Sequence, residues 1–127
     1  MASSSADAAR AAVARAIVAL ERACLDADAA FVERRWPDVR SAFHRQSALT
    51  GELARIFSEA PDVAPDRDEK VARRMRGVFT FREDQLRRMR AYRDEVGERL
   101  RAIGKINAFS RTIGRRVSRI GVVDGQY

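Results

Sequence analysis

The chain has one cysteine, Cys24, and three prolines among its 127 residues, and only 7% of it is aromatic. A single cysteine excludes an internal disulfide, which is typical of a protein in a reducing compartment. No stretch approaches the roughly 20 uninterrupted apolar residues that a membrane-spanning helix needs. The N-terminal residues lack the basic cluster and apolar core of a secretion signal. We therefore expect a cytoplasmic protein without a membrane span.

Residues that carry chemistry are also scarce. The chain has one histidine, His44, and a zinc site needs about four histidine or cysteine ligands at suitable spacing. Neighbouring acidic residues do not share a helix face, which applies to the pairs Asp26/Asp28, Glu83/Asp84 and Asp94/Glu95. No glycine-rich phosphate loop follows a strand. We expect neither catalysis nor a bound cofactor or metal.

Helix-forming residues are plentiful, and apolar residues recur at steps of three and four, which is the period of an amphipathic helix. Cys24 falls on the first such row, where a small buried core residue is expected rather than a reactive thiol. This row consists of Val13, Ile17, Leu20, Cys24, Ala27 and Phe31.

A second helical row follows Pro37, which indicates either a break between two helices or a kink in one. The row is Val39, Phe43, Gln46, Thr50, Leu53 and Phe57. Two prolines between positions 60 and 66 then predict a loop. Asp66, three residues before Glu69, matches a capping box at the start of a third helix.

The third row is long and continues for more than thirty residues to Ile103. Gly104 is the position where this helix is expected to bend or fray. The sequence thus predicts an all-α protein, either an antiparallel helical hairpin or a three- to four-helix bundle. We expect residues 1–104 to form the bundle and residues 105–127 a basic amphipathic tail helix.

The segment after position 100 carries +5 of the net charge of +7. Such a basic excess attracts an acidic protein surface, a nucleic acid or a membrane surface. The residues expected to bind anions are Lys105, Arg111, Arg115, Arg116 and Arg119. Nucleic-acid binding stays open as an alternative, although the tail has few aromatic residues that could stack on bases.

Residues 26–53 resemble the small bacterial flagellar export chaperones of the FliT and FlgN type. In that family an acidic stretch with small residues precedes a tryptophan and an apolar helix, a pattern matched here by Trp36, Val39, Phe43, Gln46, Leu49 and Leu53. The long helical row from Val71 to Ile103 and the short tail are also similar. The arginine bias and Pro37 depart from the family pattern.

The resemblance implies a cytoplasmic chaperone or adaptor that binds amphipathic helices of secreted subunits and keeps them unassembled. The expected partner-binding residues are Met75, Val78, Phe79, Leu86, Met89, Val96, Leu100 and Ile103. The tail residues Ile106, Phe109, Ile113, Val117 and Ile120 are expected to form a displaceable cover over that surface. A coiled-coil stalk component of a secretion apparatus stays a further alternative, and the protein is expected to be a monomer or a homodimer.

Overall fold

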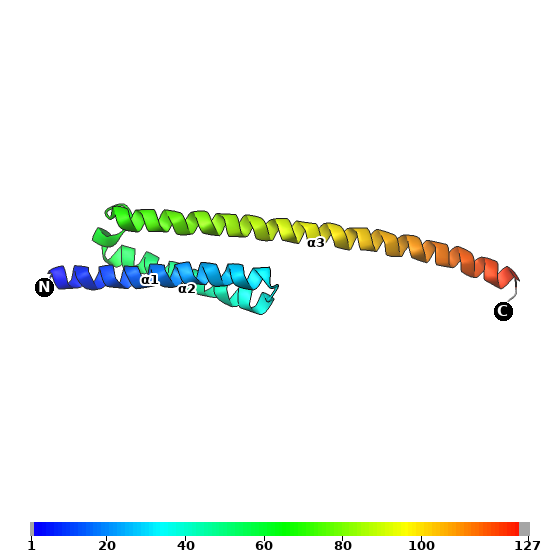
Figure 1. Ribbon diagram of the computed structural model, residues 1–127, viewed down its shortest axis with the longest axis horizontal. Helices are drawn as coiled ribbons and strands as arrows, with labels where there is room; N and C mark the ends of the chain where they lie inside the picture. The colour runs from blue at the N-terminus through cyan, green and yellow to red at the C-terminus, as the bar shows by residue number, and fades with distance from the viewer. Residues whose placement is uncertain (1, 125–127) are drawn as a thin grey trace. The chain divides into compact units, whose positions relative to one another are not determined.

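The computed structural model describes the backbone of residues 2–124 and the side chains of residues 5–115. Residues 2–124 form three α-helices, α1 (Ala2–Val32), α2 (Trp36–Glu59) and α3 (Glu69–Asp124), with a short 3-10 helix, η1 (Pro61–Val63), before α3 (Figure 1). No strand occurs between residues 2 and 124, so the prediction of an all-α protein is confirmed. The chain divides into two compact units, residues 1–86 and residues 87–127.

The chain breaks between α1 and α2 and does not continue through a kink. Arg34 has a positive φ of 59°, the left-handed conformation that ends many helices. The N–H groups of Arg34 and Arg35 then donate to the carbonyls of Phe31 and Ala30, at 3.0 and 2.9 Å. This hydrogen-bond pair is a Schellman motif with arginine at the position where glycine is usual. Pro37 follows in the first turn of α2, where its missing N–H costs nothing.

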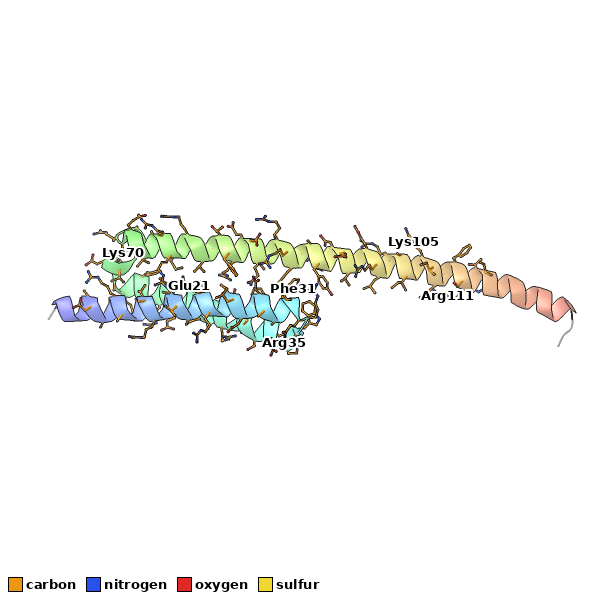
Figure 2. The ribbon with its side chains drawn as sticks, viewed as in Figure 1. Glu21, Phe31, Arg35, Lys70, Lys105 and Arg111 are labelled. Carbon is orange, nitrogen blue, oxygen red and sulfur yellow. The ribbon has the colours of Figure 1, made fainter. Side chains whose placement is uncertain are left out.

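Aromatic and cationic groups pack around this turn (Figure 2). The Phe31 and Trp36 rings meet edge to face, with centroids 5.8 Å apart. The Arg34 guanidinium lies 4.5 Å from the centroid of the Phe31 ring and also donates to the Phe31 carbonyl at 2.7 Å. These contacts stabilise the turn that lets α2 reverse along α1.

The core of the first unit is built on α1. All six residues of its predicted row are buried, from Val13 to Phe31. Three further alanines of α1 are also buried, namely Ala16, Ala23 and Ala30. Because alanine is short, the backbones of α1 and α2 approach closely, whereas α3 approaches neither as closely. Val39, Leu53 and Ile56 of α2 and Val63 of η1 complete this side of the core.

The beginning of α3 closes the first unit. Met75 and Val78 are buried in the shared core, and the Arg74 guanidinium forms an ion pair with the Glu21 carboxylate of α1 at 2.5 Å. The helix is capped by Asp68, whose Oδ1 accepts from the backbone N–H groups of Lys70 and Val71 at 3.0 and 3.3 Å. The prediction of Asp66 as the cap was wrong, because α3 starts two residues later than the capping-box pattern requires.

Two buried glutamines join the three helices. Gln46 of α2 is 0% exposed and Gln85 of α3 is 1% exposed. Gln46 Nε2 donates to Gln85 Oε1 at 3.3 Å and, at 3.5 Å, to the carbonyl of Ala23 in α1. Gln85 Nε2 donates to the carbonyl of Cys24 at 2.9 Å and to Asp28 Oδ1 at 2.7 Å. Each amide N–H therefore has an acceptor, which is what makes such burial tolerable.

Candidate functional site

The second unit presents large apolar side chains to solvent. Among its described residues, 87–115, none is buried. Leu100, Ile103, Ile106, Phe109 and Ile113 are between 43% and 66% exposed. An amphipathic helix in a folded protein normally buries its apolar face, and a large exposed apolar patch commonly marks an interaction site. This surface is the strongest candidate for a binding site.

The eight residues predicted to bind a partner are divided between the two units of the chain. Met75 and Val78 lie in the core of the first unit, at 6% and 4% exposure, where they support the bundle. Phe79 and Leu86 belong to the same unit but are exposed. The other four lie in the second unit, where Leu100 and Ile103 are exposed and Met89 and Val96 are half-buried.

The described tail residues continue the apolar row of the same helix. α3 runs through Gly104 without interruption to Asp124. Ile106, Phe109 and Ile113 are exposed and lengthen the apolar row, and their role as a displaceable cover stays a prediction. The side chains of Val117 and Ile120, predicted as part of the same cover, lie outside the described residues, as do those of Arg116 and Arg119.

Charge is divided unevenly between the two units. Residues 1–86 contain fourteen basic and fourteen acidic side chains, whereas residues 87–127 contain eleven basic and four acidic ones. The whole net charge of +7 therefore belongs to the second unit. Of the predicted anion-binding residues, Lys105, Arg111 and Arg115 are described, and all three are exposed. Figure 2 labels Lys105 and Arg111 on α3.

A separate apolar cleft of about 550 Å³ opens in the first unit. Its walls are the sides of α1 and α3, and the residues that line it include Leu25, Phe81 and Gly77. A Cβ placed on Gly77 would meet no atom within 4 Å, so packing does not require glycine there. The absent side chain leaves the cleft open. Leu25, an exposed residue on α1, was not singled out by the sequence patterns.

Cys24 lies at this cleft but is poorly suited to chemistry. The thiol is buried, and burial raises its pKa above the ordinary value, with smaller contributions from the nearby Asp28 and Glu21 carboxylates and an opposing one from Arg82. A raised pKa lowers the fraction of thiolate, which is the nucleophilic form. The predicted role of Cys24 as a small core residue agrees with this burial.

The described part of the chain shows neither a group of metal ligands nor a membrane-spanning helix. Residues there do not bring three or more histidine, cysteine or acidic side chains together as metal ligands would be. His44, the sole histidine, is exposed on α2. None of the described helices combines the length and the apolar character needed to cross a membrane.

Gln85 and Asp68 were not singled out from the sequence, although a signal for Gln85 was present. Gln85 stands seven residues after Val78 and fourteen after Val71, which places it on the buried row of α3. Polar residues at such positions are easily taken for surface residues.

Comparison of the chain with protein-family models, with curated proteins and with solved structures finds no match.

Proposed function

We propose that this protein is a helix-binding chaperone or adaptor for flagellar-type export. It would hold an amphipathic helix of a secreted subunit on the apolar row of the second unit, from Met89 to Ile113. The observation that carries the proposal is the exposure of large apolar residues at helical spacing on a helix that buries none of its described residues in this unit. A partner helix would remove that surface from water.

The chemistry of the row suits a helical client. Met89 is unbranched and adapts to differently shaped partners, while Leu100, Ile103 and Phe109 supply the larger contact area. The arginines beside the row favour a client whose polar flank is acidic. The resemblance of residues 26–53 to the export chaperones supports the choice of secreted subunits as clients.

A second candidate function, nucleic-acid binding, is favoured by one observation. The whole net charge of +7 lies in residues 87–127. Three acids, Asp94, Glu95 and Glu98, interrupt the basic face, and Arg93 and Arg99 form ion pairs with Asp94 and Glu95. Those acids would repel phosphates, so a helical protein client agrees better with the surface.

Capture from lysate of the source cells tests the proposal. Tagged full-length protein is compared with the double variant Leu100→Asp/Ile103→Asp, and captured proteins are identified by mass spectrometry. Val18→Asp is the matched control, because Val18 is an exposed apolar residue of α1 in the first unit. We expect secreted filament or hook-junction subunits on the parent protein and on the control, with at least a tenfold loss on the double variant.

Capture of the same subunits by the double variant would rule out the proposed surface. The nucleic-acid alternative is tested separately with a short duplex and a single strand of DNA over a range of salt concentrations. Phosphate contacts weaken steeply as salt rises, whereas an apolar helix interface changes little. Retention of DNA near physiological salt, with steep loss above it, would support the second function against the first.

A further inference from the structure

The cleft of about 550 Å³ lies wholly within the first unit, and one face each of α1 and α3 lines it. The lining residues are Glu21, Cys24 and Leu25 of α1 and Arg73, Arg74, Gly77, Val78 and Phe81 of α3. Within each helix they recur at steps of three and four or adjoin such a position, as residues on one helix face do. Pockets that bind small molecules have volumes of about 300–1,000 Å³ and combine an apolar lining with a few polar groups. The cleft has that size and that composition.

The apolar lining of the cleft extends from the core to the surface. Cys24 and Val78 belong to the hydrophobic core and are buried. Phe81 packs against that core and is half-buried, whereas Leu25 is 61% exposed. A hydrocarbon group in the cleft would contact these side chains and remove part of the Leu25 surface from water, which is favourable in proportion to the apolar area buried.

Gly77 lies in the interior of α3, where glycine stabilises a helix less than alanine does. A Cβ built on Gly77 would have no atom of the protein within 4 Å, so the packing of the first unit gives no reason for the glycine. Because Gly77 lines the cleft, a side chain at this position would take up space there. The glycine therefore keeps open a space that a ligand can fill.

The polar lining of the cleft is cationic. Its charged residues are Glu21, Arg73 and Arg74, which gives a net charge of +1. The Arg74 guanidinium is already paired with the Glu21 carboxylate. Arg73 is exposed and forms no ion pair with any residue that the structure describes. A carboxylate complements a guanidinium well, because the two groups can form a pair of parallel hydrogen bonds.

We propose that this cleft binds a small amphipathic carboxylate of the fatty-acid type, with its hydrocarbon chain along the apolar lining and its carboxylate at Arg73. One cation without a protein partner favours a ligand with a single negative charge over a polyanion, which gains affinity from many cations. The inference goes beyond the proposed function and does not rest on it. The proposed client surface, from Met89 to Ile113, belongs to the second unit, whereas every residue of the cleft belongs to the first.

Titration of the isotope-labelled full-length protein with octanoate, below the concentration at which octanoate forms micelles, tests the inference. We expect saturable shifts in the amide resonances of Leu25, Gly77 and Phe81. Octanol has the same hydrocarbon chain without the charge, and it should bind about fivefold more weakly because it cannot form the ion pair. No saturable shift at these three residues would overturn the inference, as would shifts confined to the apolar row of the second unit.

Filling the cleft tests its location. Gly77→Leu should raise the dissociation constant of octanoate about tenfold or more, because the new side chain and the probe compete for the same space. The midpoint of urea unfolding should not fall, since leucine favours a helix more than glycine does. Gly51→Leu is the matched control, because Gly51 is exposed within α2 and a Cβ there also meets nothing within 4 Å. It should change the dissociation constant less than twofold, and equal effects of the two leucines would overturn the inference.

Removal of the cation tests the position of the carboxylate. Arg73→Gln should weaken octanoate binding about fivefold and leave octanol binding within about twofold. Arg76→Gln removes the same charge from an exposed residue of α3 that does not line the cleft, and it should change octanoate binding less than twofold. Equal effects of the two arginine variants would overturn the pairing with Arg73. The capture experiment is read out by client identity on the second unit, so either proposal can fail while the other stands.

Discussion

Gln46 Nε2 donates to Gln85 Oε1 across 3.3 Å, between two side chains that are sealed from solvent in the interior of the first unit. The Oε1 atom of Gln46 accepts from Arg82 Nε at 3.0 Å, so the pair is also tied to a half-buried cation. The side-chain oxygen and the NH2 group of Gln46 and those of Gln85 thus belong to one connected hydrogen-bond network. Removing one member leaves the others buried without full partners.

We expect Gln85→Leu to lower the free energy of unfolding by about 1–3 kcal/mol, because Gln46 and the Asp28 carboxylate each lose a hydrogen-bond partner. Urea unfolding measures the change. The double variant Gln46→Leu/Gln85→Leu should cost less than the sum of the two single changes, since each single change already breaks the shared bond. Ser47→Ala, at an exposed neighbour on α2, is the control and should stay within about 0.5 kcal/mol. Strict additivity would contradict a coupled pair.

Asp68→Ala should lower the stability of the first unit by about 1 kcal/mol, because Asp68 Oδ1 accepts from two N–H groups of the first turn of α3. Asp66→Ala is the matched control, with the same change in charge two residues earlier, and it should have an effect below about 0.5 kcal/mol. Chemical unfolding of both variants decides between them. A larger loss for Asp66→Ala would restore the cap that the sequence pattern predicted.

At Arg34 we expect glycine to be more stable than alanine by about 1 kcal/mol, because the φ of 59° is strained for a residue with a Cβ. Both variants lose the same contacts with Phe31, so their difference isolates the backbone. The same two substitutions at Arg40, an exposed residue inside α2, should give the reverse order by about 1 kcal/mol. Thermal unfolding of the four variants provides the comparison, and alanine above glycine at both positions would refute the strain at the turn.

Cys24 should make stability fall at alkaline pH. Burial raises the pKa of its thiol, so the folded protein holds the proton more tightly than the unfolded chain. The stabilisation is fully present below the ordinary thiol value, about 9, and is lost as pH rises through the higher value of the folded state. Unfolding free energies measured across this range should decline more steeply for the parent protein than for Cys24→Ala. Parallel pH profiles would contradict the shift.

The helical architecture could be predicted because apolar spacing is a direct consequence of helix geometry. The predicted row from Val13 to Phe31 is buried in full, and of the two alternatives left open at Pro37, a break and a kink, the structure shows the break. The turn itself could not be anticipated, since Arg34 is not a residue type that favours a positive φ. The cap was misplaced by two residues because Asp66 and Asp68 carry the same chemistry.

The candidate site was predictable only in part. The spacing of apolar residues does not show which part of a long row packs against the other helices of the same chain. The buried Met75 and Val78 therefore could not be distinguished from the exposed Leu100 and Ile103 in the sequence. The cleft beside Leu25 depends on how two helices from distant parts of the chain pack together, which no local pattern encodes. The uneven division of charge between the two units could not be predicted from the sequence. The boundary between the units, after residue 86, is defined by the contacts that residues make in the folded chain.

The alanines of α1 have a consequence for the order in which the first unit opens. Short side chains bring the α1 and α2 backbones together, whereas α3 is held to them by longer side chains at a greater separation. We therefore expect fewer backbone atoms to be shielded from solvent where α3 meets the hairpin. Amide hydrogens at the start of α3 should exchange with solvent ahead of those in the hairpin, which would make α1 and α2 the last part of this unit to come apart.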